Sequence, residues 1–152
     1  MINKAVFPGS FAPFTKGHES LVLRALPLFD EIVIAVGINS EKDEYFSLEK
    51  RCKWIEQVFV NEPKVRVQRY EGLTIDFCEK LKANYILRGL RNSSDYKYEK
   101  GIAQMNRSMK NHIDTIFIIT EPEVSHISST LVRDIVKNGG DVSQFIPNGV
   151  TI

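Results

Sequence analysis

The sequence predicts an α/β fold with a doubly wound parallel sheet of five strands. Short apolar runs typical of strands alternate with segments of helical periodicity, which implies βαβ units joined by right-handed crossovers. Residues 32–36 are continuously apolar and mostly β-branched, as in strands covered on both faces of a parallel sheet. The 152 residues suffice for one domain and contain no internal repeat or linker, so we expect a single Rossmann-like domain over residues 1–152.

The first half of the chain is expected to form two strands and two helices. Residues 4–7 are the first strand, and residues 18–29 are a helix because their apolar side chains recur on one broad face. Residues 32–36 then form the second strand. Ser47 is a typical N-cap and is expected to open a helix that ends near Val60.

The middle of the chain continues the alternation. Residues 65–70 alternate between apolar and polar side chains, as a third strand does. Thr74 is expected to cap a helix over residues 75–81. Residues 85–87 form a short fourth strand that ends at Arg88-Gly89.

The last third is expected to hold the remaining strand and three helices. A long helix runs from Asp95 to about Lys110, and residues 115–119 form the fifth strand. Ser128 or Ser129 caps the next helix, which glycines after residue 138 end. A short final helix is expected over residues 142–145.

Composition excludes several classes of protein. The formal net charge of +1 gives no reason to expect a nucleic-acid partner. No apolar stretch approaches the roughly 18 residues that a membrane span needs, and the N-terminus lacks a signal peptide, so we expect a cytoplasmic protein without membrane contact. The two cysteines, Cys52 and Cys78, have no metal-binding spacing and are expected to be free thiols in a reducing compartment.

Unusual polar clusters follow each expected strand. Because ligands of such sheets bind outside the carboxyl ends of the strands, these clusters are expected to form one composite site. They are residues 9–18, 39–42, 72–74, 88–91 and 125–130.

The first cluster is a glycine turn that leads into a helix with a histidine in its first turn. Gly9 permits close backbone approach, Thr15 is a candidate cap, and Gly17 leaves room for a ligand at the helix start. Backbone N–H groups at such a point bind phosphates. His18 can donate an N–H to a phosphate oxygen in either protonation state, and the helix dipole leaves that state open. Taken alone, the histidine could also be incidental.

Two further clusters carry phosphate-binding chemistry, each with a simpler alternative. Arg88-Gly89-Leu90-Arg91 follows a strand, and arginine forks match phosphate oxygens, although a solvated turn fits as well. The hydroxyl run Ser128-Ser129-Thr130 could present donors to a triphosphate or simply cap a helix.

These motifs together resemble a known group of enzymes. Residues 10–18, which end in Gly17-His18, resemble the signature of the nucleotidyltransferase superfamily, and residues 127–133 match its Ile-Ser-Ser-Thr-x-x-Arg motif. The segments 88–91, 95–99 and 105–107 resemble those of the bacterial phosphopantetheine adenylyltransferase family within it. The resemblance covers nearly the whole chain, in the family's order.

The resemblance implies a reaction and its partners. The family transfers the adenylyl group of ATP to 4′-phosphopantetheine, which gives 3′-dephospho-coenzyme A and pyrophosphate. The acceptor is already an anion, so direct in-line attack needs neither a general base nor a covalent enzyme intermediate. Mg²⁺ is expected as cofactor through the ATP phosphates, with no metal ligand from the chain. A homohexamer is also implied.

The resemblance assigns roles residue by residue. The expected catalytic residues are His18, which stabilises charge at the α-phosphate, together with Ser10, Lys42 and Arg91. Expected ATP contacts come from the three motifs: Ser10, Phe11, His18, Gly89, Leu90, Arg91, Glu99, Val124, Ser125, His126, Ile127, Ser128, Ser129 and Thr130. Expected acceptor contacts are Ser10, Lys42, Leu73, Thr74, Arg88, Met105 and Asn106, with Ile102 along the same arm. Plain core packing is an equal alternative for the apolar members of that set.

The sequence departs from the family at two positions. Ala12 stands where the family usually has an aspartate, and Val124 stands where it often has an aromatic residue near the adenine. Two alternatives therefore remain. One is another enzyme of the superfamily, with an acceptor such as nicotinamide mononucleotide. The other is a nucleotide-binding module without catalytic activity.

Overall fold

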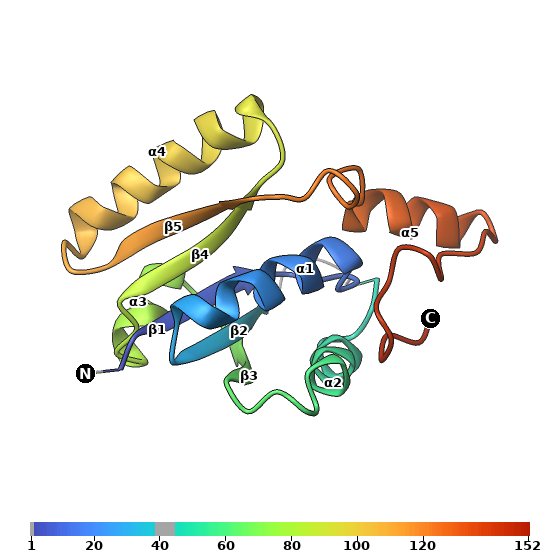
Figure 1. Ribbon diagram of the computed structural model, residues 1–152, viewed down its shortest axis with the longest axis horizontal. Helices are drawn as coiled ribbons and strands as arrows, with labels where there is room; N and C mark the ends of the chain where they lie inside the picture. Colours follow the sequence, from blue (N-terminus) through green and yellow to red (C-terminus); the bar gives the residue numbers. More distant parts are fainter. Residues whose placement is uncertain (1, 39–44) are drawn as a thin grey trace.

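The computed structural model describes residues 2–38 and 45–152 and shows the predicted α/β architecture. Five parallel strands form one sheet in the order β3-β2-β1-β4-β5, with helices on its faces (Figure 1). The predicted doubly wound parallel sheet is therefore confirmed. Lys42, one of the expected site residues, lies outside the described residues.

The strands begin close to the predicted positions, and several extend further. Their bounds are β1 Lys4–Gly9, β2 Glu31–Gly37, β3 Val65–Tyr70, β4 Tyr85–Leu90 and β5 Asp114–Ile119. Because β1 and β4 extend beyond the predicted apolar runs, Gly9 and Arg88 lie at the carboxyl ends of the strands themselves.

The sheet opens between its two central strands. β1 pairs with β2 along its whole length, from Lys4↔Glu31 to Gly9↔Val36. Its pairing with β4 is confined to Ala5↔Tyr85 and Val6↔Ile86. The strand order also reverses here, and such a switch point is where ligands bind in open α/β sheets. The fold therefore places a cleft at the carboxyl ends of β1 and β4.

Alternate residues of the central strands build two separate hydrophobic layers. One layer packs β1 and β2 against α1 and α2, with Phe7, Ile34 and Ile55 buried in it. The other packs the opposite faces against α3 and includes Val33 and Ile75. Burial on both faces explains why residues 32–36 form an unbroken apolar run.

Each of the five longer helices that the sequence predicts is present, but several begin or end at other residues than predicted. Their bounds are α1 Lys16–Ala25, α2 Leu48–Val58, α3 Thr74–Lys80, α4 Ser93–Met109 and α5 Ser129–Lys137. The α-helix predicted over residues 18–29 stops at Ala25 and gives way to a 3₁₀ turn, η1 Leu26–Leu28. Pro27 lies in that turn and cannot donate the N–H that a continuing α-helix requires.

Three predicted caps are confirmed and one is wrong. Thr15, Ser47 and Ser128 cap α1, α2 and α5, so the first of the two candidate serines is the cap of α5. Thr74 does not cap α3, because it is the first residue of the helix and Leu73 occupies the cap position without a side-chain bond. The Thr74 hydroxyl is hydrogen-bonded to Tyr70 instead.

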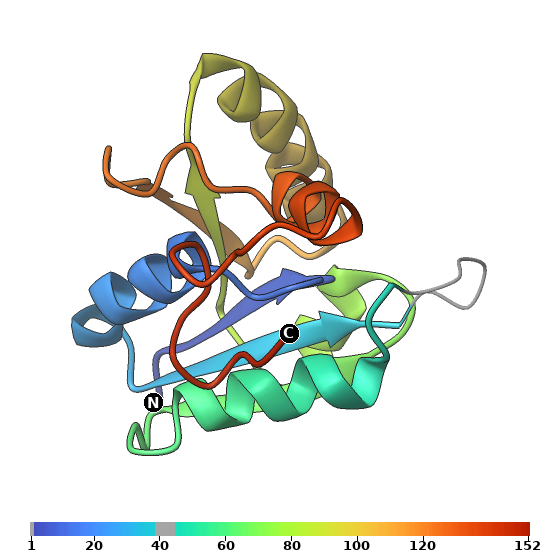
Figure 2. The ribbon, with the colours of Figure 1, turned by 90° about the vertical axis from the view of Figure 1, so that its right-hand side faces the viewer.

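The predicted final helix over residues 142–145 is also wrong. The segment forms a turn in which Asp141 accepts hydrogen bonds from the backbone and hydroxyl of Ser143, a local arrangement that competes with helix formation. The chain then runs back past α2, where Val150 is buried in the core (Figure 2). On the way, the carbonyl of Phe145 accepts the N–H of Lys16 at 2.9 Å and so ties this segment to the start of α1.

Both cysteines are buried free thiols, as predicted. Burial raises the pKa of Cys78 to about 12, so this thiol is unreactive at neutral pH. Among the described helices, none is both long and apolar enough to cross a membrane.

Candidate active site

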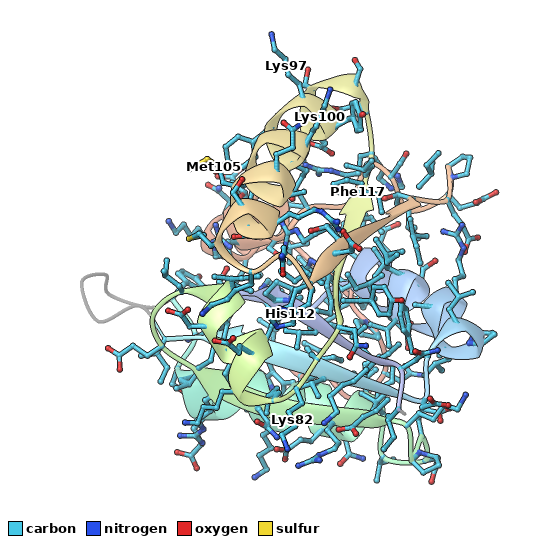
Figure 3. The ribbon with its side chains drawn as sticks, turned by 90° about the vertical axis from the view of Figure 1, so that its left-hand side faces the viewer. Lys82, Lys97, Lys100, Met105, His112 and Phe117 are labelled. Carbon is cyan, nitrogen blue, oxygen red and sulfur yellow. The ribbon has the colours of Figure 1, made fainter. Side chains whose placement is uncertain are left out.

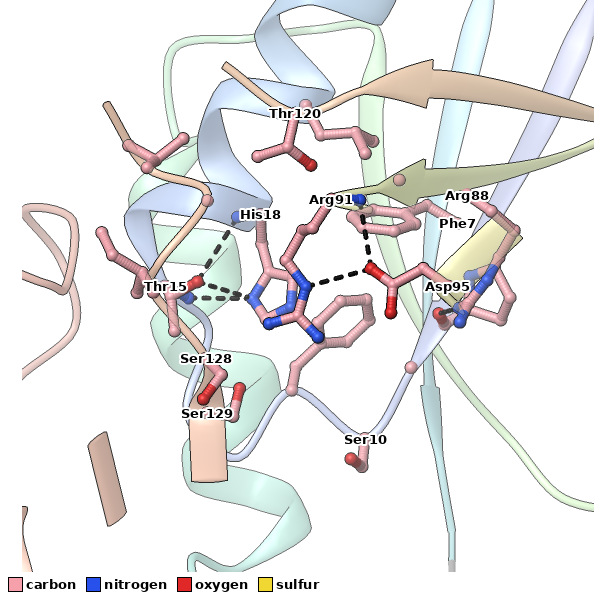
Figure 4. Close-up of a pocket in the computed structure, with 18 of the residues that line it drawn as sticks. Phe7, Ser10, Thr15, His18, Arg88, Arg91, Asp95, Thr120, Ser128 and Ser129 are labelled. Atoms are coloured by element: carbon pink, nitrogen blue, oxygen red, sulfur yellow. Dashed lines mark hydrogen bonds and ion pairs between the residues drawn. The ribbon is translucent and has the colours of Figure 1, made fainter. Parts of the chain in front are cut away.

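Two adjoining cavities lie where the sheet opens. The larger, of about 390 Å³, is lined by the β1–α1 loop, the end of β4 and the loop before α5 (Figure 4). The smaller, of about 200 Å³, lies over the ends of β1 and β3 and against α4. Both are lined by Pro8, Gly9, Arg88 and Glu99, so these residues form a shared wall. Two ligands bound in the cavities would meet there.

Gly9 determines the shape of the β1–α1 loop. A Cβ atom at this position would lie 2.8 Å from the ring of Phe11, too close for any side chain, so glycine lets that ring fold back over the strand end. Phe11 itself has a positive φ of 49°. Its ring packs at 5.1 Å from that of Phe7 and at 5.4 Å from that of Phe14. These rings form an apolar cage beside the larger cavity.

Three side chains from other elements hold the carbonyls of this loop. Arg51 of α2 is buried and donates to the carbonyl of Ser10 at 2.6 Å. Arg133 and Ser129 of α5 donate to the carbonyls of Ala12 and Pro13 at 2.7 and 2.8 Å. These three bonds tie the loop that contains Ala12 to α2 and α5.

His18 is fixed by a reciprocal exchange with Thr15 at the start of α1. The backbone N–H of His18 donates to Thr15 Oγ1 at 3.4 Å, and the backbone N–H of Thr15 donates to His18 Nδ1 at 3.0 Å (Figure 4). A backbone N–H can only donate, so Nδ1 must be unprotonated and the neutral ring carries its proton on Nε2. Thr15 therefore sets both the orientation and the tautomer of His18.

The surroundings of His18 keep its ring neutral. The ring packs at 5.0 Å from that of Phe11 and 5.2 Å from that of Phe14. Burial, together with the positive charges of Arg88 and Arg91, lowers the pKa of His18 to about 4. The low pKa and the bond from the Thr15 N–H to Nδ1 both favour a neutral side chain near pH 7, which donates through Nε2–H.

A carboxylate orients each of the two arginines. Arg88 donates through Nε and Nη2 to Glu99 at 3.1 and 2.6 Å, and through Nη1 to the carbonyl of Pro8 at 2.9 Å. Glu99 is only 8% exposed, so its carboxylate is largely withdrawn from water. Arg91 donates through its backbone N–H and Nε to one oxygen of Asp95 at 3.0 and 3.2 Å. Both guanidinium groups are therefore held at the cleft before any ligand binds.

Most of the expected ATP-binding residues line the larger cavity. They are Ser10, Phe11, His18, Gly89, Arg91, Glu99, Val124, Ile127, Ser128 and Ser129. Four others do not line it: Leu90, Ser125, His126 and Thr130. Leu90 follows Gly89 along a strand, where side chains alternate between faces. The hydroxyl of Ser125 donates to the carbonyl of Pro122, and His126 is exposed with its ring against that of Phe145.

The expected acceptor residues divide in the same way. Thr74, Arg88, Ile102 and Asn106 line the smaller cavity. Leu73 is 57% exposed and Met105 is 66% exposed, and neither lines a cavity. Figure 3 shows Met105 on the outer side of α4. Core packing, the alternative for the apolar members of this set, is therefore wrong for Met105.

Sequence reasoning missed several residues of the two cavities. Tyr70 and Thr120 lie at the carboxyl ends of β3 and β5. The rule that ligands bind outside the carboxyl ends of parallel strands would have indicated both residues. Asp95 lies in the first turn of α4 and pairs with Arg91, which precedes the helix, so helical spacing alone did not indicate this ion pair. Thr115 and Ala103 carried no signal, because neither belongs to a motif.

Sequence comparisons connect the chain with one group of proteins. Residues 6–135 match the model of the cytidylyltransferase-like family. A phosphopantetheine adenylyltransferase of Flavobacterium psychrophilum is 52% identical over 151 residues, which cover 99% of each chain. Those of Bacteroides thetaiotaomicron and Leptospira biflexa are 46% and 44% identical and cover 99% and 96% of this chain and 99% and 91% of theirs.

Solved structures share the fold at much lower identity. A putative nicotinate-nucleotide adenylyltransferase of Vibrio parahaemolyticus has a TM-score of 0.72 at 18% identity, covering 99% of this chain and 90% of that one. A bifunctional NMN adenylyltransferase/ADP ribose pyrophosphatase of Francisella tularensis has a TM-score of 0.71 at 20% identity, covering 96% and 44%. These likenesses support the architecture alone.

The state of His18 can be measured by ¹⁵N NMR titration of the imidazole ring. We expect a neutral ring protonated on Nε2 and a pKa near 4, because burial and two arginines oppose its charge. The unfolded chain would take up the same proton near the ordinary value of 6.5. His18 therefore lowers the free energy of unfolding as pH falls from about 6.5 to about 4, and not above that range. A pKa at or above 6.5, or a proton on Nδ1, would contradict this description.

Proposed function

The chain belongs to the phosphopantetheine adenylyltransferase family of the cytidylyltransferase-like proteins, and on that premise we propose that it transfers the adenylyl group of ATP to 4′-phosphopantetheine. The products are 3′-dephospho-coenzyme A and pyrophosphate. The observation that carries the proposal is the pair of cavities with a shared wall at Arg88 and Glu99. ATP takes the larger cavity, the acceptor takes the smaller, and the two phosphates meet at the wall.

The chemistry needs positioning and charge stabilisation more than a nucleophile. The acceptor phosphate is already an anion and attacks the α-phosphate of ATP directly, with pyrophosphate leaving on the opposite side. Holding both reactants in line can supply about 7 kcal/mol or more of the barrier. Donors aimed at the developing negative charge supply much of the rest. His18 Nε2–H is such a donor, since its other nitrogen is committed to Thr15.

The arginines divide between the two phosphates. Arg91 lines only the larger cavity and is assigned to ATP, while Arg88 lines both and is assigned, with Lys42, to the acceptor phosphate. Arg88 has five N–H donors, of which three bind Glu99 and Pro8 among the described residues. Two remain for a phosphate oxygen. Glu99 thus acts by orienting Arg88 as well as by lining the ATP cavity.

The start of α5 is assigned to the triphosphate. Ser128 and Ser129 line the larger cavity at the N-terminus of this helix, where backbone N–H groups and the helix dipole favour an anion. Val124 and Ile127 line the same cavity and would pack against the adenine. Val124 can supply apolar contact there but no ring stacking.

Mg²⁺ is proposed as the cofactor, bound through ATP. The described part of the chain contains no group of three potential metal-ligating side chains. The two carboxylates of the larger cavity, Asp95 and Glu99, are both paired with arginines. Phosphate oxygens and water therefore fit as the ligands of the ion, which would offset the charge of the triphosphate.

We also propose a homohexamer in the cytoplasm, as the family resemblance implies. Tyr98, Ile102, Met105 and Met109 lie along α4 at helical spacing, and each is at least 40% exposed. An apolar stripe of this kind on a folded protein is typical of a contact surface between chains. Two buried free thiols are consistent with a reducing compartment.

Pyrophosphate release tests the proposed function directly. The purified chain is incubated with ATP and Mg²⁺ together with phosphopantetheine, with nicotinamide mononucleotide, or with no acceptor. We expect pyrophosphate release only in the mixture that contains phosphopantetheine as the acceptor. Release with nicotinamide mononucleotide alone would instead indicate another enzyme of the superfamily, and no release in any mixture would indicate a binding module.

Replacement of His18 tests its role at the α-phosphate. We expect His18→Ala to lower kcat by at least about 100-fold with little change in the KM for ATP, as for loss of one transition-state donor. His112→Ala is the matched control, because His112 is exposed and lines neither cavity. Near-normal turnover of His18→Ala would remove this residue from the mechanism.

Replacement of Lys42 tests the assignment of the acceptor phosphate. We expect Lys42→Ala to raise the KM for phosphopantetheine more than the KM for ATP, because the lysine is assigned to the acceptor alone. Lys53→Ala, on an exposed position of α2, is the control for loss of a positive charge. Equal changes in the two KM values would overturn the assignment.

A further inference from the structure

A pair of hydroxyl groups stands on the wall of the smaller cavity. Tyr70, the last residue of β3, and Thr74, the first residue of α3, have their side-chain oxygens 2.9 Å apart. Both residues line the smaller cavity, and neither lines the larger one. Any ligand group that meets this pair therefore belongs to the acceptor and not to the nucleotide.

The ring of Tyr70 packs against a neighbouring aromatic ring. It stacks on the ring of Phe77 with centroids 5.0 Å apart and planes at 28°. A Cβ atom built at Gly37 would lie 3.6 Å from Cε1, an ordinary van der Waals distance, so the ring lies beside the Gly37 position. The stacking orients the ring, so the phenol oxygen has a defined position on the cavity wall.

Thr74 uses its hydroxyl for the cavity and not for its own helix. Leu73 is the N-cap of α3 and makes no side-chain bond, although a threonine or serine there would stabilise the helix by about 1 kcal/mol. The hydroxyl one residue later is bonded to Tyr70 instead. Helix α3 therefore lacks a side-chain cap, and the hydroxyls of Tyr70 and Thr74 lie at the cavity.

The chemistry of the pair favours a neutral ligand group. Two hydroxyls have two donors and four acceptor lone pairs, and their mutual bond uses one of each. One donor and three lone pairs are left. The charged residues of this cavity, Arg88 and Glu99, are paired with each other on the shared wall. A secondary amide or an alcohol, which both donates and accepts, matches the pair better than a charged group does.

We propose that Tyr70, acting through its hydroxyl pair with Thr74, is a specificity-determining residue for the acceptor. The pair binds an amide or hydroxyl group in the arm that extends from the acceptor phosphate. This inference rests on the proposed function, since 4′-phosphopantetheine carries both kinds of group in its arm. Apolar side chains such as Ile86 and Ile102 line the same cavity, so a ligand that lacks the polar group would leave the remaining donor of the pair without a partner there.

The test removes each hydroxyl without removing the side chain. Tyr70→Phe keeps the ring that stacks on Phe77, and Thr74→Val keeps the branched shape. We expect each to raise the KM for phosphopantetheine about 3- to 10-fold, the effect of one lost hydrogen bond, with kcat and the KM for ATP unchanged. In the double variant, the KM should rise by less than the product of the single effects, because either change breaks the same pair.

Controls separate binding from folding. Tyr85→Phe removes a hydroxyl at the opposite end of the sheet, in a residue that lines neither cavity, and should leave all three constants unchanged. The melting temperatures of Tyr70→Phe and Thr74→Val should fall slightly and by similar amounts, because each variant loses the same internal hydrogen bond. If both single variants keep the acceptor KM, or if the KM for ATP rises as much, the inference is wrong while the proposed function stands. If the unmodified chain does not use phosphopantetheine, both are wrong.

Discussion

The exchange of hydrogen bonds between Thr15 and His18 is the interaction on which the site depends. It caps α1, fixes the imidazole ring and assigns its proton to Nε2 with two bonds that are local in sequence. The cage of phenylalanine rings and the two arginines then keep that ring neutral. A neutral donor of fixed direction can stabilise growing charge without competing for protons, which suits a reaction between two phosphates.

The divergence of β1 from β4 creates the space for ligands beside His18. A sheet that stayed paired to its carboxyl edge would have no room for ligands between its central strands. Here pairing ends at Val6↔Ile86, and the freed strand ends line both cavities. The loop after β1 would otherwise be free to vary, but Arg51, Ser129 and Arg133 hold its carbonyls. Pre-organisation of the site therefore comes from α2 and α5, far along the chain.

Local patterns in the sequence predicted the strands, the long helices and the edge of the sheet that carries the site. They failed where contacts between neighbouring elements or the exposure of a helix face decide. A threonine before a helix looks like a cap, and only the fold shows that Thr74 bonds to Tyr70. Met105 belongs to the predicted long helix, but the sequence did not show that its side chain is exposed. The bond between Arg88 and Glu99 joins a strand to a helix, so no motif could indicate it.

The shared wall has a consequence for inhibition. Because Pro8, Gly9, Arg88 and Glu99 line both cavities, the two cavities adjoin at these residues. A single molecule that joins an adenosine group to a pantetheine-like arm through a short anionic linker could therefore occupy both cavities at once. Its second half would bind at the high effective concentration set by the linker, so such a bisubstrate compound should exceed the affinity of either half by orders of magnitude.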